Sequence, residues 1–154
     1  MIKIRKIVPI QADAQRLISE LDNYQLSIYP EESAHLDAAE ELSQSNVYFI
    51  GAYNDSKIIG IGAIKYVSNG IEYGEIKRVF VSEHGRGKGI SRLIMAKLEG
   101  HAADKGIKTL RLETGIYQPE AIGLYERLGY TKRGSFGSYP EGDPYSVFME
   151  KILK

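Results

Sequence analysis

The most informative run of this chain reads Val79-Phe-Val-Ser-Glu-His-Gly-Arg-Gly-Lys-Gly-Ile-Ser91. Its β-branched and aromatic start, together with Ile76 upstream, predicts a strand. Glycines and cations then alternate from Gly85 to Gly89, which predicts a tight turn, and apolar residues from Leu93 onward predict a helix. A strand, a glycine turn and a helix in this order aim unpaired backbone N–H groups and a helix dipole at an anion. The sequence therefore predicts a ligand that carries phosphate.

Two common phosphate-binding patterns do not fit this turn. The P-loop needs four residues between its glycines and then Lys and Ser or Thr, whereas a single residue separates Gly87 from Gly89. The dinucleotide fingerprint needs a third glycine where Ile90 or Arg92 stands. A plain glycine turn into a surface helix is the alternative interpretation, and the neighbouring cations, strand and helix argue against it.

At these residues the chain resembles the GNAT superfamily of N-acetyltransferases. The acetyl-CoA loop of that family reads Arg or Gln, two residues, Gly, any residue, and then Gly or Ala. Arg86, Gly89 and Ile90 fit this pattern, while Ser91 departs from its last position and is still small. The resemblance implies a small single-domain bacterial-type member of the superfamily, with one domain over residues 1–154.

A second stretch, Gln118–Tyr130, resembles the family motif in which Asn precedes a helix with Ala, Leu-Tyr and a closing Gly-Phe. Gln118 stands in place of the Asn and Tyr130 in place of the Phe; the matching residues are Ala121, Leu124, Tyr125 and Gly129. The two motifs together are more specific than either alone, and the resemblance covers roughly residues 47–151.

The elements expected along the chain give a mixed α/β (α+β) domain, in which a central, mostly antiparallel sheet is flanked by helices, as in the acyl-CoA N-acyltransferase fold. Residues 24–45 show only a short helical pattern. Helices are expected over Ala12–Leu21, Arg92–Lys105 and Pro119–Leu128. Strands are expected over Ile2–Arg5, Val47–Tyr53, Ile58–Val67, Ile71–Val81, Thr109–Glu113, Tyr130–Arg133 and Tyr145–Lys151.

Composition narrows the class of protein. The chain has 154 residues, with 20 Lys and Arg against 20 Asp and Glu, so it has no overall attraction for nucleic acid or an anionic membrane. It has no cysteine, and its three histidines show no metal-ligand spacing, so neither a disulfide nor a metal is expected. Without a signal-peptide pattern or a long apolar run, a soluble cytoplasmic protein is expected. A homodimer is a possible assembly.

The resemblance implies acetyl-CoA as co-substrate, with the pyrophosphate on the glycine turn and the pantetheine arm against the main chain of Val79–Val81. Gln118 would contact the cofactor if it replaces the usual Asn. Cofactor contacts are thus expected from Val79, Phe80, Val81, Arg86, Gly87, Lys88, Gly89, Ile90, Ser91, Arg92, Gln118 and Tyr125.

Two residues are expected to act in catalysis. The family tyrosine beside the thioester sulfur corresponds to Tyr125, whose phenol would protonate the leaving thiolate; packing in the core is its alternative role. Glu75, six residues before Val81, is the expected general base through water, because a glutamate in this region often has that role in the family. A salt bridge with Lys77 is its alternative, and Glu113 and Glu72 are the other candidate bases.

The acceptor is expected to meet the segments Tyr24–Leu42 and Phe136–Pro144. A site for a cation could form there from Tyr24, Tyr29, Tyr139, Tyr145, Glu31, Glu32, Glu141 and Asp143. The function expected is acetyl transfer to the primary amine of a small or amino-acid-like molecule by direct attack in a ternary complex. Acetylation of a protein lysine or N-terminus, and a non-catalytic acyl-CoA-binding regulatory module, are the alternatives.

Overall fold

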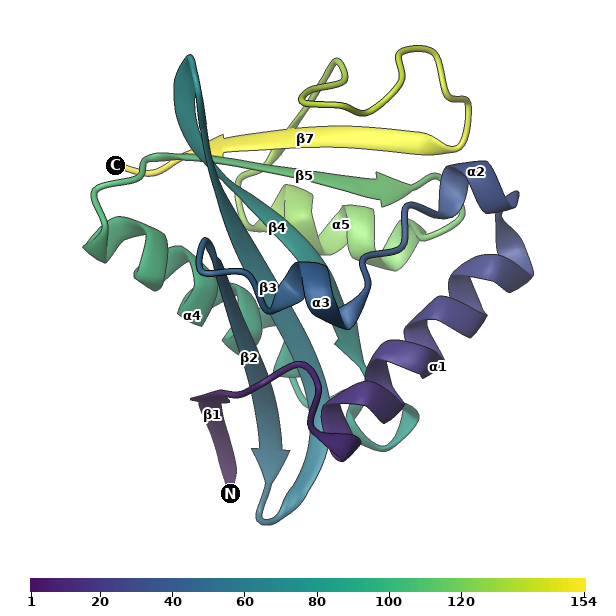
Figure 1. Cartoon of the computed structure of the whole chain (residues 1–154), viewed down its shortest axis with the longest axis vertical. Helices are drawn as coiled ribbons and strands as arrows, with labels where there is room; N and C mark the ends of the chain where they lie inside the picture. The colour runs from purple at the N-terminus through teal and green to yellow at the C-terminus, as the bar shows by residue number, and fades with distance from the viewer.

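The computed structural model describes the backbone of residues 1–154 and every side chain except that of Asn69. Seven strands form one sheet in the order β1-β2-β3-β4-β5-β7-β6 (Figure 1). The strands are β1 (Ile2–Lys6), β2 (Val47–Asn54), β3 (Lys57–Asn69), β4 (Ile71–Val81), β5 (Thr109–Gly115), β6 (Thr131–Arg133) and β7 (Ser146–Ile152). The helices are α1 (Ala12–Ile28), α2 (Glu31–Ala34), α3 (Ala39–Leu42), α4 (Ile90–Asp104) and α5 (Pro119–Arg127).

The fold class expected from the sequence is confirmed, and the differences lie at element ends. The first helix was expected to stop at Leu21, where its apolar spacing is lost, but α1 continues to Ile28, and Leu26 and Ser27 of its last turn are exposed. Pro30 explains the actual end, because proline forces the residue before it into an extended conformation, and Tyr29 has φ −121° and ψ 151°. Residues 24–45 thus complete α1 and then form the short helices α2 and α3.

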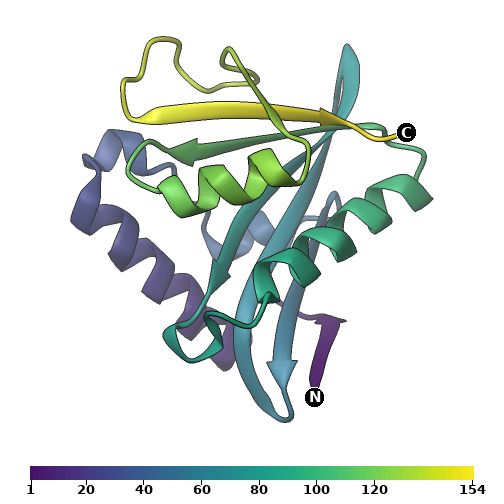
Figure 2. The same ribbon diagram turned by 180° about the vertical axis from the view of Figure 1, so that it is seen from behind.

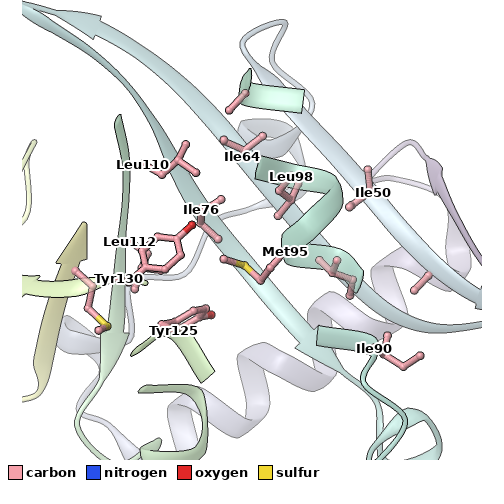
Figure 3. Close-up of a cluster of buried hydrophobic side chains, with 14 of the residues drawn as sticks. Ile50, Ile64, Ile76, Ile90, Met95, Leu98, Leu110, Leu112, Tyr125 and Tyr130 are labelled. Atoms are coloured by element: carbon pink, nitrogen blue, oxygen red, sulfur yellow. The ribbon is translucent and has the colours of Figure 1, made fainter. Parts of the chain in front are cut away.

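Helices cover both faces of the sheet. On one face, α1 and α3 contribute Ala14, Leu17, Ile18 and Leu42 to a cluster with β2 and β3. On the other face, which Figure 2 turns toward the viewer, α4 and α5 lie against the sheet. Figure 3 shows this second cluster, in which Met95 and Leu98 of α4 lie beside Ile64 and Ile76 of the strands.

The sheet opens between β4 and β5, its only parallel neighbours among the described strands. The two strands pair only at Gly74–Ile76 with Leu110–Leu112, and Figure 1 shows them diverging beyond that point. The later part of β4 therefore has no strand beside it on the β5 side, within the part of the chain that the structure describes.

A bulge shapes the same part of β4. Ala63 pairs with Lys77 and Ile61 pairs with Phe80, so one residue of β3 faces two residues of β4. Arg78, the first of those two, has φ +58°, a left-handed conformation that is unfavourable for a side chain of its size. Its buried guanidinium forms an ion pair with the partly exposed carboxylate of Asp22 in α1. The bulge thus lets both Lys77 and Arg78 reach the α1 side of the sheet.

Close packing of α4 on β3 fixes the start of α4 relative to the sheet. A Cβ atom added at Gly62 would lie 2.5 Å from Cγ2 of Ile94, a side chain that is 0% exposed. Only glycine permits this approach without a shift of the helix.

We expect Gly62→Val to destabilise the fold by about 1–3 kcal/mol, because the added methyls overpack the contact with Ile94. Gly100→Ala is the matched control, since a Cβ at this exposed position of α4 meets nothing within 4 Å. Alanine favours a helix over glycine by about 0.8–1 kcal/mol, so the control is expected to be stabilised. Urea unfolding measures both, and a neutral Gly62→Val variant would contradict the packing argument.

Candidate active site

The glycine turn after β4 has an open geometry. Gly87 and Gly89 adopt φ +77° and +72°, and a Cβ at either position would meet nothing within 4 Å. Gly89 is the N-cap of α4, so the first N–H groups of this helix, from Ile90 onward, have no carbonyl partner within the helix. The arrangement is the open, electropositive end of a fifteen-residue helix, which can receive an anion.

The cations of the turn lie at its surface. Arg86, Lys88 and Arg92 are exposed, and Ser91 is half-buried. The Nε atom of Arg86 donates to the carbonyl of Val81 at 3.4 Å, which holds the guanidinium close to the end of β4. Exposed cations around open N–H groups suit a phosphate better than they suit a neutral ligand.

A small cavity of about 80 Å³ lies where β4 and β5 diverge. Four parts of the chain, far apart in the sequence, converge on it. The lining side chains include Lys77 and Val79 from β4, Glu113 and Thr114 from β5, Gln118, Ala121 and Tyr125 around α5, and Tyr29, His35 and Asp37 around α2. The gap in the sheet is thus closed by α5 on one side and by the α1–α2 segment on the other.

Tyr125 lies at this cavity and is 7% exposed. Its ring packs edge-on against Tyr130 with centroids 5.9 Å apart, at the end of the core cluster (Figure 3). Burial raises the pKa of Tyr125 to about 12, and the charge of Glu113 adds to this shift. The phenol is therefore neutral at physiological pH and can donate a proton. The sequence left two roles open for Tyr125, packing in the core and donating a proton. Both are compatible with this position, because the ring packs in the core cluster and the residue also lines the cavity.

Gln118 is the N-cap residue of α5 and lines the same cavity. Its Oε1 atom accepts a hydrogen bond from the Tyr29 hydroxyl at 3.3 Å. That hydroxyl also accepts the N–H of Tyr117 at 3.1 Å and rests on Gly115, where an added Cβ would lie 1.8 Å from the oxygen. Tyr29 therefore ties the α1–α2 segment to the turn between β5 and α5.

Glu113 is the carboxylate that faces the small cavity from β5. Its Oε2 atom accepts a hydrogen bond from Ser146 Oγ at 2.8 Å. Burial raises the pKa of Glu113 to about 7, although the Ser146 hydrogen bond and the charge of Lys77 oppose the shift. A carboxyl group that is half ionised near neutral pH is suited to accept and release protons.

Glu75 lies in a buried polar group with Lys77, Asp37 and Tyr139. Its Oε2 atom accepts hydrogen bonds from the Tyr139 hydroxyl at 2.5 Å and from Lys77 Nζ at 3.2 Å. Lys77 also pairs with Asp37 at 3.1 Å. Burial lowers the pKa of Lys77, but the charges of Glu75 and Asp37 outweigh burial, so the net shift is upward and the ammonium persists. The salt bridge considered as the alternative role of Glu75 is present.

A second, larger cavity of about 730 Å³ lies on the other side of this polar group, and Glu75 lines it together with Tyr73 and Arg111. Side chains of His35, Asp37, Lys77 and Tyr139 line both cavities. Glu72, the remaining candidate base, is exposed near the start of β4. The polar group around Glu75 therefore separates a small inner cavity from a wide outer one.

Only some of the residues that the sequence predicted to meet the acceptor lie at or near the small cavity. Tyr29 and Tyr139 line the small cavity, Tyr145 packs edge-on against Tyr29 at 6.3 Å, and Asp143 lies 3.6 Å from His35. The others expected there, Tyr24, Glu31, Glu32 and Glu141, are exposed. Sequence reasoning missed His35 and Ser146, because no periodic pattern or spacing links residues 111 positions apart.

The described residues lack both a metal-binding cluster and a membrane-spanning helix. No group of three or more His, Asp or Glu side chains is arranged to hold a metal ion. No helix in the same part of the chain is long and apolar enough to cross a membrane.

Comparison with known proteins gives concordant matches. The model of the acetyltransferase (GNAT) family matches residues 14–130. The IAA acetyltransferase of Azospirillum brasilense is 40% identical over 152 residues, which cover 99% of this chain and 98% of that protein. The N-acetyltransferase YsnE of Bacillus subtilis, itself uncharacterized, is 34% identical over 127 residues, or 80% of this chain and 82% of that protein.

Solved structures are similar over the whole chain. A Klebsiella pneumoniae protein named as an acyl-CoA N-acyltransferase superposes with a TM-score of 0.83 at 36% identity, covering 100% of this chain and 99% of that one. The PaiA N-acetyltransferase of Thermoplasma acidophilum, solved in complex with coenzyme A, gives a TM-score of 0.76 at 24% identity, with 99% of each chain covered. The second likeness concerns the fold alone.

Proposed function

The chain belongs to the acetyltransferase (GNAT) family and is an acyl-CoA-dependent acyltransferase, and we propose that it acetylates the primary amine of a small molecule with acetyl-CoA. The acceptor attacks directly in a ternary complex. The observation that carries this proposal is that Tyr125 and Glu113 line one cavity in the gap of the sheet. A proton donor and a proton acceptor are the two groups that amide formation from a thioester and an ammonium ion needs.

The residues around the gap fit acetyl-CoA, which supplies the activated acetyl group as a thioester. The exposed cations and the open helix end from Arg86 to Arg92 would hold the pyrophosphate. The main chain of Val79, Phe80 and Val81, which has no strand on its β5 side in the described structure, would pair with the pantetheine amides. Gln118 and Tyr125 would contact the arm near its sulfur end, because both line the small cavity.

Glu113 would act as the general base. An amine with an ordinary pKa of about 10.4 costs roughly 4–5 kcal/mol to deprotonate at pH 7, so a base at the attack site is valuable. Glu113 shares its cavity with Tyr125, and its raised pKa of about 7 matches that task. Glu75, the base expected from the sequence, stays a candidate, but its partners Lys77 and Tyr139 favour a role in holding the cavity wall.

We expect acetyl-CoA and CoA to raise the melting temperature, because a ligand that binds only the folded state stabilises it. At 100 times Kd the gain is about 2.7 kcal/mol, or roughly 5–10 °C for a domain of this size. Gly89→Val is expected to abolish the shift, since the branched side chain would stand over the open helix end at φ +72°. Thermal denaturation with and without CoA measures this.

Gly106→Val is the matched control for the CoA experiment. Gly106 follows the opposite end of α4, has φ +75° and also has open space around its Cβ position. The two variants therefore carry the same backbone strain at opposite ends of one helix. A folded Gly89→Val variant that keeps the full CoA shift would show that the loop is not the phosphate site.

We expect Tyr125→Phe to lower turnover by about 10- to 1,000-fold, close to the range that general acids contribute, with little change in CoA affinity. The variant keeps the buried ring and removes only the proton donor. Release of CoA thiol from acetyl-CoA measures turnover against a panel of small amines, amino acids, lysine peptides and IAA, the last because the Azospirillum relative is named for it.

The same panel separates the alternative functions. Thiol release with peptides alone would assign the chain to protein acetylation, and CoA binding without release to any acceptor would favour a regulatory module. Unchanged turnover in Tyr125→Phe would leave the tyrosine with a packing role only.

The pH dependence of turnover tests whether Glu113 or Glu75 is the general base. With a base of pKa about 7, turnover should rise with pH and level off above pH 7, where Glu113 is ionised. We expect Glu113→Gln to remove this plateau and to lower turnover at pH 7 by about 10²- to 10⁴-fold. High pH should then restore much of the rate, because solvent supplies the neutral amine.

Glu75→Gln is the matched comparison. It is expected to lower the melting temperature, since it breaks the pairing with Lys77, while turnover per folded molecule stays near normal. If Glu75→Gln removes the plateau and Glu113→Gln does not, the base is Glu75, as the sequence suggested.

A further inference from the structure

We propose that Ser146 and His35 form a proton relay that carries the proton taken by Glu113 from the inner cavity to the outer one. This inference rests on the proposed function and adds two residues to it. Neither side chain belongs to the glycine turn or to the second sequence motif. Both act on the acceptor side of the gap, where the amine must lose its proton.

The balance of the reaction requires an exit for one proton. An amine that enters as R–NH₃⁺ first loses a proton to Glu113, which leaves the nitrogen its electron pair. The N–C bond then forms, the C–S bond breaks, and the thiolate takes a proton from Tyr125. A second N–H proton restores the phenol. The products are an amide and a thiol, so the proton on Glu113 is in excess and must reach solvent before the next turnover.

Three atoms in contact define the route. Ser146 Oγ lies 2.8 Å from Glu113 Oε2 and 3.4 Å from His35 Nε2. A serine hydroxyl both donates and accepts, so it can turn from one partner to the other. When Glu113 is ionised, Ser146 donates to it. When Glu113 is protonated, Glu113 donates to Ser146, and the Ser146 proton passes to His35, which becomes an imidazolium.

The register of the sheet brings these side chains together. Gly115 of β5 pairs with Ser146 of β7, and Glu113 pairs with Phe148. Glu113 and Ser146 are therefore diagonal neighbours on one face of the sheet, at a spacing that side chains can bridge. His35 follows α2 with φ +49°, a left-handed conformation that turns the chain at this point.

His35 connects the two cavities. It lines both of them, and its side chain is 15% exposed, whereas Glu113 faces the inner cavity. Asp143 lies 3.6 Å from the same Nε2 atom and is itself fixed by the N–H of Tyr145 at 2.9 Å. This carboxylate is placed to pair with the imidazolium that forms when the proton arrives. From His35 the proton leaves through the outer cavity of about 730 Å³.

The same contacts exclude a nucleophilic serine. In a Ser-His-Asp triad the carboxylate holds one ring nitrogen while the other takes the serine proton. Here Ser146 and Asp143 both approach Nε2 of His35. Ser146 also donates to a carboxylate, so its hydroxyl is used for proton transfer and not for attack.

The charged groups around the relay come from β4 and from the segment before β7. Lys77 and Glu75 of β4 act on Glu113 in opposite directions, and Asp143, before β7, acts on both Glu113 and His35. Tyr139 packs edge-on against His35 with ring centroids 5.1 Å apart. Variants at Ser146 and His35 leave these groups in place, so a change in turnover can be assigned to the relay.

The kinetic test compares Ser146→Ala and His35→Gln with the wild type at saturating acetyl-CoA and acceptor. Each is expected to lower turnover by about 10- to 100-fold with little change in the KM for acetyl-CoA. Added imidazole buffer should restore the rate of both variants, because a small base then removes the proton, and should leave the wild type unchanged. The double variant should be no slower than either single variant, since both interrupt one route.

Two control variants accompany this test. Ser146→Thr keeps the hydroxyl on a strand and is expected to retain turnover. Ser138→Ala removes a hydroxyl that lines the outer cavity and is expected to behave as wild type. The relay is refuted if Ser146→Ala turns over normally while Glu113→Gln is slow, an outcome that leaves the proposed function intact. Additive losses without a buffer response would also refute it.

A second measurement needs no turnover. Nitrogen-15 NMR of the His35 ring in the full chain should show, in addition to the titration of the imidazole, an inflection near pH 7 at Nε2 when Ser146 switches partners. That inflection should vanish in Ser146→Ala and in Glu113→Gln. If no acceptor in the panel is acetylated, the proposed function fails, and this titration still decides the relay: an identical Nε2 curve in wild type and Ser146→Ala would overturn it.

Discussion

The short parallel pairing between β4 and β5 is the constraint on which the rest of this structure depends. The strands share hydrogen bonds only over Gly74–Ile76 and Leu110–Leu112, and then separate. Buried backbone groups that lack partners cost about 1–3 kcal/mol each, so the separated edge of β4 is stable only beside solvent or a ligand that pairs with it. The bulge at Arg78 falls in the same part of β4, on its β3 side, and is held by the ion pair with Asp22. The gap and the inner cavity both follow from this one separation.

Charge is compensated unevenly between Glu113, which faces the inner cavity, and Glu75, which lies in the wall beside it. Glu75 shares Lys77 with Asp37 and accepts from Tyr139, so its negative charge is compensated within the wall. Glu113 has a serine as its hydrogen-bond partner, and burial raises its pKa to about 7. Two glutamates on neighbouring strands therefore differ in chemistry because of their partners, which come from other elements.

That difference marks the limit of what the sequence can predict. The strand, glycine turn and helix around Gly89 are local, so their pattern alone indicated both the elements and an anion site. Tyr125 followed from a second local motif. The choice between Glu75 and Glu113 depends instead on where Lys77, Ser146 and other distant residues lie, and the register of β5 with β7 is set by the whole sheet. His35 could not be found from the sequence, because it lies in the segment with the weakest pattern and acts through Ser146, 111 positions away.

The contact between Tyr29 and Gly115 has a consequence for how sequences of this kind can diverge. Because the space of a Cβ at position 115 is filled by the hydroxyl of Tyr29, the two positions cannot change independently. A lineage that gains a side chain at 115 must first shorten residue 29, and it then loses the hydrogen bond to Gln118 as well. Residues 29, 115 and 118 are thus coupled by packing and hydrogen bonding, and they join the α1–α2 segment to the turn between β5 and α5. Correlated changes at positions 29, 115 and 118 among relatives would identify those that keep the Tyr29 contact with the turn between β5 and α5.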